Sequence, residues 1–125
     1  MAEFIKLNQF GDSRGCLTVI EKQIPFDIKR VFYIEGASGY ARGGHRHHVT
    51  IQALICLSGS CVISNNNGLV KEEFLLDDSG KCLLLQPEDW HIMHSFTPHA
   101  ILLVLASTYY DQHDYIDAPY PDAAV

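Results

Sequence analysis

The chain has 125 residues, 47% of them hydrophobic, and a formal net charge of −6. This length fits a single domain, residues 1–125, with one hydrophobic core, and the acidic balance argues against nucleic acid as a partner. The apolar runs are far too short to span a bilayer and residues 1–15 do not resemble a signal peptide, so we expect no membrane contact and a cytoplasmic protein.

The hydrophobic pattern predicts an all-β chain. Short runs rich in Val, Ile, Phe and Leu are typical of strands, and many such runs at regular spacing favour a sandwich or barrel. The turns "SGS" (58–60) and "NNNG" (65–68) are expected to form hairpins, and residues 108–125 an irregular C-terminal arm. The predicted strands are 16–22, 29–35, 50–57, 60–65, 70–76, 81–86, 91–96 and 100–107.

Basic residues are concentrated at the start of the chain. Residues 1–48 carry seven Lys or Arg against five Asp or Glu, whereas residues 49–125 carry two against ten. All four arginines lie in the first part, which favours a local anion site, with chance clustering and surface ion pairs as the alternative. The four cysteines have no CxxC spacing and lie among apolar residues, so we expect buried, reduced thiols; they are Cys16, Cys56, Cys61 and Cys82.

Three histidines occur within four positions of "GYARGGHRHHVTIQ" (39–52). On a strand, His45 and His47 would point to one face, and Arg46 and His48 to the other. Imidazole titrates near neutral pH, so His45 and His47 are acid–base candidates, with histidines of the core or surface as the alternative reading.

The spacing around these histidines resembles the first cupin motif, G-x5-H-x-H-x4-E-x6-G, with Gln52 in place of the glutamate. A neutral amide is a weak metal ligand, so we expect no metal. The segment "QPEDWHIMH" (86–94) resembles the second motif, with His91 or His94 as its histidine and Asp89 where a glycine is usual. The resemblance implies a cupin-type double-stranded β-helix, a jelly-roll barrel in a single domain.

Six blocks together resemble the WxcM-like sugar 3,4-ketoisomerases over residues 5–116: "DSRGCLTVIE", "IPFDIKRVFYI", "RGGHRHH", "QALICLSGSC", "WHIMHSF" and "VLASTYYDQHDYI". The chain departs from the family pattern at three positions. Arg46 stands where the family has Ala, His48 where it has Lys, and Asp117 where it has Arg, which puts a C-terminal phosphate contact in doubt.

The resemblance implies an acid–base isomerase that needs no redox cofactor and no metal. It would move the carbonyl of dTDP-4-keto-6-deoxy-D-glucose from C4 to C3 through an enediol, in deoxysugar, O-antigen or S-layer glycan synthesis. By resemblance, His47 is the base at C3, His45 its proton-shuttling partner, and Tyr33 a hydrogen-bonding group for the sugar oxygens.

The other implied contacts surround this dTDP-linked ligand. The arginines Arg14, Arg30 and Arg42 are candidates for the pyrophosphate and sugar, and Gln52 and His91 for the sugar. Trp90 is expected in the core, with stacking on the base as a second reading. The family usually forms homodimers, and exposed edge strands gain by pairing.

Two alternatives remain open at this point. A related cupin, the dTDP-sugar 3,5-epimerase type, also uses a base histidine but leaves the carbonyl in place. A noncatalytic sugar-binding cupin would keep the arginines without a poised base. The configuration of the product at C4, gluco or galacto, does not follow from these residues.

Overall fold

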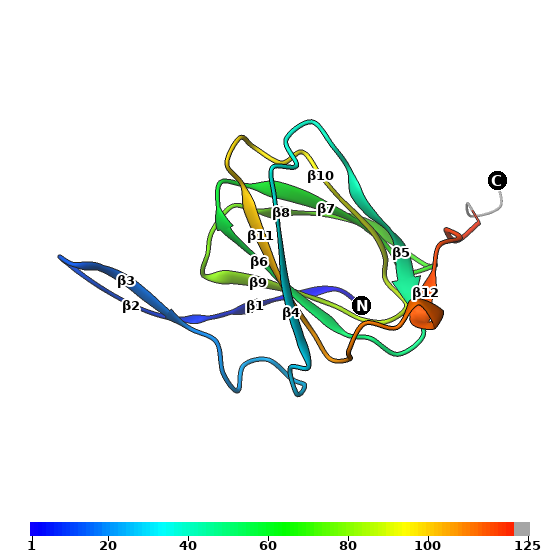
Figure 1. The fold of residues 1–125 in the computed structure, drawn as a ribbon, viewed down its shortest axis with the longest axis horizontal. Helices are drawn as coiled ribbons and strands as arrows, with labels where there is room; N and C mark the ends of the chain where they lie inside the picture. Colours follow the sequence, from blue (N-terminus) through cyan, green and yellow to red (C-terminus); the bar gives the residue numbers. More distant parts are fainter. Residues whose placement is uncertain (122–125) are drawn as a thin grey trace.

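Two five-stranded antiparallel sheets form the body of the protein in the computed structural model, which describes residues 1–121 (Figure 1). Their strand orders are β1-β9-β6-β11-β4 and β12-β5-β10-β7-β8. The predicted all-β, cupin-type jelly roll is confirmed; the last four residues of the predicted arm, 122–125, lie outside the described residues. The strands are β1 (Glu3–Lys6), β2 (Asn8–Asp12), β3 (Gly15–Val19), β4 (Arg30–Glu35), β5 (Arg42–His47), β6 (Gln52–Ser58), β7 (Cys61–Asn66), β8 (Lys71–Leu76), β9 (Lys81–Leu85), β10 (Trp90–His94), β11 (Ile101–Ala106) and β12 (Tyr115–Ile116).

Each of the eight predicted strands overlaps a strand of the structure. The list of predicted strands omitted β1, β2, β5 and β12, because the hydrophobic pattern is weak in all four. Every residue of β2 is exposed, β5 is made of Arg, Gly and His, and β12 has two residues. Pairing with neighbouring strands stabilises these short or polar strands, and β1 also packs Ile5 against buried apolar residues.

One of the two predicted hairpins is confirmed. The predicted turn, residues 65–68, covers the end of β7 and the start of the connection to its antiparallel neighbour β8, and Gly68 has the positive φ of 92° that this turn requires. The expectation for residues 58–60 is wrong, because β6 and β7 belong to different sheets and the segment carries the chain from one sheet to the other. Gly59 has a φ of 65°, and a Cβ there would lie 2.4 Å from Thr97 Oγ1.

The central strands of the first sheet are buried on both faces. Its inner face contributes Leu54, Leu83 and Val104 to a core between the sheets. A second cluster lies on its other face, where Ala53 and Leu84 pack with residues of the segment between β3 and β4. This explains why β6 and β9 are apolar without alternation, since strands covered on both faces need no polar side.

The hairpin of β2 and β3 projects away from the body (Figure 1). Phe10 is 63% exposed and Leu17 64% exposed. Cys16 is exposed, so the expectation that all four thiols are buried is wrong for this residue; the other three are buried. The reason is that β3 has no layer packed against it in a single chain.

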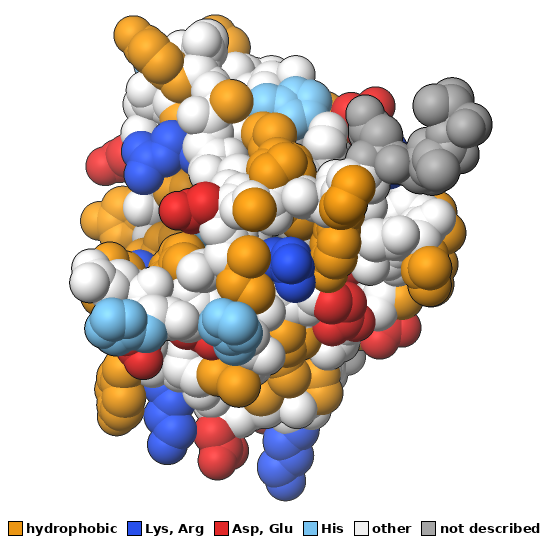
Figure 2. Space-filling model, turned by 90° about the vertical axis from the view of Figure 1, so that its right-hand side faces the viewer, with side chains coloured by type: hydrophobic (Ala, Val, Ile, Leu, Met, Phe, Trp, Pro, Cys, Tyr) orange, Lys and Arg blue, Asp and Glu red, His pale blue; other side chains and the backbone are white. Residues whose placement is uncertain are grey.

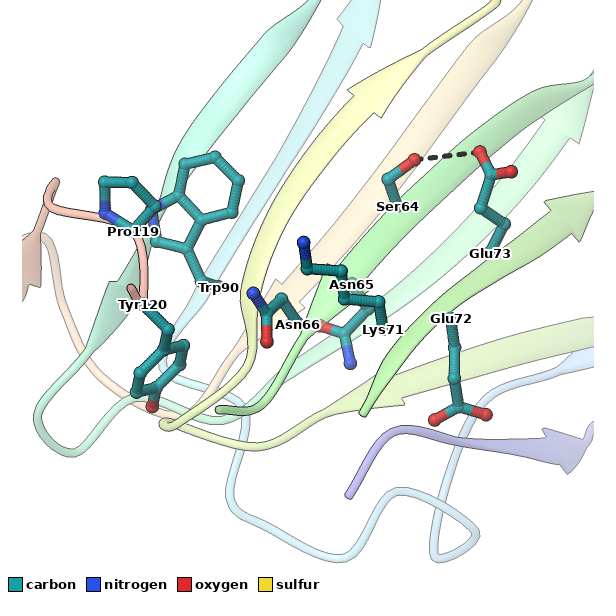
Figure 3. Close-up of a pocket in the computed structure, with 9 residues that line it drawn as sticks. All are labelled: Ser64, Asn65, Asn66, Lys71, Glu72, Glu73, Trp90, Pro119 and Tyr120. Carbon is teal, nitrogen blue, oxygen red and sulfur yellow. Dashed lines mark hydrogen bonds between the residues drawn. The ribbon is translucent and has the colours of Figure 1, made fainter. Parts of the chain in front are cut away.

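The end of the described arm lies on the outer face of the second sheet, where Figure 3 shows Pro119 and Tyr120 beside Trp90. A 3-10 helix (Gln112–Asp114) leads into β12, which pairs with β5. Trp90 Nε1 donates to the carbonyl of Asp117 (3.0 Å), and the Arg46 guanidinium lies 4.3 Å from the ring centroid of Tyr120. Trp90 is therefore a half-buried anchor for the arm rather than a core residue. Within residues 1–121, no helix is long and apolar enough to cross a membrane.

Candidate active site

A cavity of about 230 Å³ opens between the two sheets. Strands β4, β5, β6, β10, β11 and β12 all contribute to its wall, so residues from both halves of the sequence meet there. Polar side chains from β5, β6 and β10 converge on apolar residues such as Leu54 and Val104. Six of the eight residues predicted from sequence line the cavity: Arg30, Tyr33, Arg42, His45, Gln52 and His91.

Two glycines let β5 approach β10 closely enough to form this wall. Gly43 and Gly44 have φ values of 87° and 82°, in the region that glycine tolerates best. A Cβ on Gly43 would lie 3.0 Å from the carbonyl oxygen of His91, so a side chain there would push the strands apart. The pairing of β10 with β5 also shifts register between His91 and Ile92. The two glycines of "RGGH" therefore allow the irregular pairing of β5 with β10 that places His45 in the cavity wall.

His45 is the histidine of the His-x-His pair that lines the cavity. Its ring centroid is 5.1 Å from that of His47 and 5.1 Å from that of His91. Burial, assisted by the neighbouring His47, lowers the pKa of His45 from 6.5 to about 4. The imidazole is therefore neutral at pH 7 and can accept a proton from a bound molecule.

His47 lies behind the cavity wall in a buried contact with Asp114. Its Nδ1 is 2.9 Å from Asp114 Oδ2, while its buried Nε2 has no hydrogen-bond partner. Because the carboxylate is an acceptor, Nδ1 carries the proton of the neutral ring and Nε2 keeps its lone pair. Burial lowers the pKa of His47, and the contact with Asp114 opposes that change.

Two further hydrogen bonds hold the carboxylate of Asp114, a residue that was not predicted from sequence. It accepts hydrogen bonds from the backbone N–H of Val49 (2.9 Å) and from the Thr50 hydroxyl. Burial alone would raise the pKa of Asp114, but the hydrogen bonds from Thr50 and Val49 outweigh it and lower the pKa. The carboxylate is thus charged at neutral pH. The only feature of the sequence that pointed to Asp114 was its place in the last block of the family resemblance, "DQHDYI".

Two buried polar residues complete the inner wall. Gln52 is 4% exposed and His91 2% exposed. His91 Nδ1 is 3.1 Å from the carbonyl of Asp89, so Nδ1 donates and Nε2 remains an acceptor. Burial lowers the pKa of His91 to about 4. The second cupin-like motif thus places His91 in the cavity, whereas His94 lies on the outer face with Ser64.

Tyr115 is a second residue that sequence reasoning missed. Its ring centroid lies 4.6 Å from those of both His45 and His47, and its hydroxyl accepts a hydrogen bond from Arg30 Nη1 (3.2 Å). The arm was expected to be irregular, yet β12 places this phenol in the cavity wall. Tyr33 lines the same cavity from β4 but is 63% exposed, which puts it at the rim.

The arginines occupy three different environments. Arg30 and Arg42 line the cavity. Arg46 lies over Tyr120 on the outer face, as strand alternation predicts. Arg14 is at the tip of the β2–β3 hairpin, where its exposed guanidinium pairs with Asp12 at 2.6 Å. A single chain therefore does not bring Arg14 together with Arg30 and Arg42.

These groups form an acid–base site with a cationic wall. Neutral imidazoles, a phenol and a buried carboxylate–imidazole pair can move protons on a bound molecule, and two guanidiniums can hold an anionic group. Within residues 1–121, no three His, Cys, Asp or Glu side chains converge in a way that could hold a metal ion. The arrangement suits proton transfer within a small anionic substrate.

Comparisons with known proteins identify related chains. The family model FdtA, described as WxcM-like, C-terminal, matches residues 1–121. A TDP-4-oxo-6-deoxy-alpha-D-glucose-3,4-oxoisomerase of Aneurinibacillus thermoaerophilus is 44% identical over 115 residues, which cover 90% of this chain and 83% of that protein.

Two solved structures are also similar. The sugar 3,4-ketoisomerase QdtA of Thermoanaerobacterium thermosaccharolyticum, in complex with TDP, is 42% identical with a TM-score of 0.91, covering 94% of this chain and 88% of that one. The TDP-quinovose 3,4-ketoisomerase WlaRB of Campylobacter jejuni is 38% identical with a TM-score of 0.90, covering 94% and 92%.

Proposed function

The chain belongs to the FdtA family of WxcM-like, C-terminal domains, and from this premise we propose that it is a sugar-nucleotide 3,4-ketoisomerase. Its substrate would be dTDP-4-keto-6-deoxy-D-glucose, whose carbonyl moves from C4 to C3, and the product would serve deoxysugar glycan synthesis. The observation that carries the proposal is the neutral His45 in the cavity wall, directly beside the buried pair of His47 and Asp114.

The positions of the two histidines suggest which of them removes the proton from the sugar and which relays it. His45 lines the cavity, so we propose that it meets the sugar and removes the proton at C3, which the C4 ketone acidifies. His47, oriented by Asp114, then relays a proton through its free Nε2. This reverses the roles that the family resemblance suggested, in which His47 was the base and His45 its partner.

Charge that develops on the sugar oxygens needs hydrogen-bond donors. The enediol passes through an enediolate-like state, and the hydroxyls of Tyr115 and Tyr33 and the amide of Gln52 are hydrogen-bond donors in the cavity wall. Arg30 holds the Tyr115 hydroxyl at 3.2 Å and favours its donation to an anionic oxygen. With these donors, the reaction needs neither a metal nor a redox cofactor.

The diphosphate would bind beside the sugar on Arg30 and Arg42. Both line the cavity wall, and an arginine pairs with phosphate oxygens through charge-assisted and often bidentate hydrogen bonds.

Figure 2 shows the face that carries β5, β12 and the arm, and its described surface mixes basic, acidic, histidine and hydrophobic side chains. Nucleic acid binding favours a continuous basic field, so we propose that neither nucleic acid nor membrane is a partner.

A second copy of this chain would complete the site. The β2–β3 hairpin exposes Phe10 and Leu17 away from the body, and an isolated two-stranded hairpin is marginal in water. The edge strand β4 exposes Val31 and Tyr33, and Tyr33 lies at the rim of the cavity. We propose a homodimer in which the hairpin covers this edge of the partner and brings Arg14 to the partner's diphosphate.

Solvent exchange and product analysis test the proposed reaction. The protein, stripped of metal by chelation, is incubated with dTDP-4-keto-6-deoxyglucose in heavy water, and the sugar is followed by NMR. We expect a carbonyl signal at C3 and deuterium at C4. Deuterium at C3 and C5 with the carbonyl still at C4 would instead identify a 3,5-epimerase, and binding without exchange a noncatalytic sugar-binding cupin.

A further inference from the structure

The arm beyond β12 is fastened to the outer face of the second sheet. Trp90 Nε1 donates to the carbonyl of Asp117 (3.0 Å), and the Tyr120 hydroxyl donates to the carbonyl of Glu88 (2.7 Å). The guanidinium of Arg46, on β5, lies 4.3 Å from the centroid of the Tyr120 ring. These contacts connect the arm to β5, to β10 and to the turn that precedes β10.

The Tyr120 ring is packed as well as hydrogen-bonded. A Cβ on Gly68 would lie 3.2 Å from two carbons of this ring, so the turn that follows β7 lies directly against it. Nε of Arg46 is buried and has no hydrogen-bond partner among residues 1–121. Packing and the attraction of a cation to an aromatic face therefore hold the guanidinium on the ring.

The strand between these contacts and the active site is very short. β12 consists of Tyr115 and Ile116, and two paired residues are too few to keep a strand in place by themselves. On the N-terminal side of β12, hydrogen bonds to the Asp114 carboxylate hold the chain. On its C-terminal side, the chain is held by the contacts of Asp117 and Tyr120.

We propose that Arg46 and Tyr120 are positioning residues, a latch that keeps β12 on β5 and so keeps the Tyr115 hydroxyl in the cavity wall. Neither residue lines the cavity, so both act through Tyr115. Within the described residues, the Tyr115 hydroxyl accepts one hydrogen bond, from Arg30 Nη1 (3.2 Å), and its position therefore depends on the backbone of β12.

The latch matters for catalysis because of what this hydroxyl would do. The inference rests on the proposed function, in which Tyr115 donates a hydrogen bond to an enediolate-like oxygen. Such a donor stabilises the transition state only if it is already in place when the charge develops. An arm that leaves β5 part of the time would remove the donor for that time.

The experiment compares loss of the latch with its conservative replacement in the full chain. Tyr120→Ala and Arg46→Ala remove the ring and the cation, whereas Tyr120→Phe and Arg46→Lys keep a ring and a cation. Tyr40→Ala is the matched control, because it removes a tyrosine that is 71% exposed and lies outside the arm. Amide hydrogen exchange measures the order of residues 114–118, and steady-state kinetics measure kcat and KM.

We expect each alanine variant of the latch to speed exchange at residues 114–118 about tenfold and to lower kcat about tenfold, as an arm in place in about one molecule in ten would do. KM and dTDP binding should change little, because Arg30 and Arg42 belong to β4 and β5 rather than to the arm. The double variant should lose no more than the worse single variant, since the cation acts on the ring. Tyr120→Phe and Arg46→Lys should recover most of the loss, and Tyr40→Ala should match the parent protein.

A Tyr115→Phe background tests the route by which the latch acts. There, Tyr120→Ala should lower kcat less than about twofold, because the hydroxyl that it positions is already absent. The full loss in that background would overturn the proposal, as would faster exchange throughout the chain. Unchanged exchange at residues 114–118 in both alanine variants would also overturn it. A parent protein that does not move the carbonyl would contradict the proposed function instead, and hydrogen exchange would still decide whether the latch holds the arm.

Discussion

Nδ1 of His47 lies 2.9 Å from Oδ2 of Asp114, a residue 67 positions later in the chain, and both side chains are buried. This contact fixes the tautomer of His47 and leaves its Nε2 as an acceptor. It also joins the arm to β5, because Asp114 immediately precedes the strand that pairs with His47. The acid–base site and the ordering of the arm therefore depend on the same contact.

Replacing Asp114 by Asn tests the orienting role of this carboxylate. The amide can present its NH2 group to His47 and so reverse the tautomer, which should lower kcat on the order of a hundredfold while KM and dTDP binding change little. Steady-state kinetics and calorimetry measure both. Thr50→Val is the matched control, since it removes one hydrogen bond to Asp114 but keeps the carboxylate. We expect Thr50→Val to lower kcat much less than Asp114→Asn does. Equal losses in both variants would indicate a purely structural role.

The roles of the two histidines can be separated by comparing His45→Asn with His47→Asn. We expect both to lose about two to four orders of magnitude in turnover, with nucleotide affinity within a few-fold of the parent protein. Only His45→Asn should also abolish exchange of the C3 proton with solvent, because His45 lines the cavity. If His45→Asn keeps C3 exchange and His47→Asn loses it, His47 is the base.

Much of this fold could be predicted from the sequence because the relevant signals are local. Apolar runs and turn residues identified eight strands, and alternation on β5 correctly separated His45 and His47 from Arg46. The spacing of the two cupin-like motifs also identified three residues that line the cavity, His45, Gln52 and His91. These features depend on residues close together in the chain.

The missed features depend on contacts between distant segments. Asp114 and Tyr115 lie in a proline-containing tail, and nothing local shows that two residues of it pair with β5. The sequence groups Arg14 with Arg30 and Arg42 by charge, but the hairpin carries Arg14 away from the body. Composition reports how many cations a segment has, whereas tertiary topology decides which of them meet.

The arginines that line the cavity should account for much of the affinity for dTDP. Arg30→Ala and Arg42→Ala should each weaken dTDP by roughly ten- to a hundredfold, since a hydrogen bond to a charged group contributes about 1.5–3 kcal/mol. Arg46→Ala is the control, because its guanidinium lies over Tyr120 on the outer face. Calorimetric titration measures each variant. The anion-site assignment fails if Arg46→Ala weakens dTDP most.

The hairpin proposal predicts that two impaired variants restore each other when they are assayed at a substrate concentration well below the KM of Arg14→Ala. If Arg14 acts in the partner's site, a mixed dimer of Arg14→Ala and His45→Asn has one intact site. Joint refolding of equal amounts should then recover about a quarter of the parent activity, because half of the dimers are mixed and each has one good site. Recovery no greater than the sum of the two variants would place Arg14 in its own subunit's site or outside the site. Light scattering confirms the dimer in each sample.

The buried histidines should make the protein less stable in mild acid. His91 has an ordinary pKa of 6.5 when unfolded and a pKa of about 4 in the folded protein, because burial disfavours its charged form. Between these values the unfolded chain binds more protons, so the free energy of unfolding falls as the pH falls from about 7 towards 4. For His91 alone the loss at pH 5 is about 2 kcal/mol. Urea unfolding at pH 8 and pH 5 measures this loss of unfolding free energy.

The His91→Asn variant should lose less unfolding free energy between pH 8 and pH 5 than the parent protein, whereas His99→Asn, at an exposed turn, should behave like the parent protein. An identical pH dependence in His91→Asn and the parent protein would show that other groups are responsible.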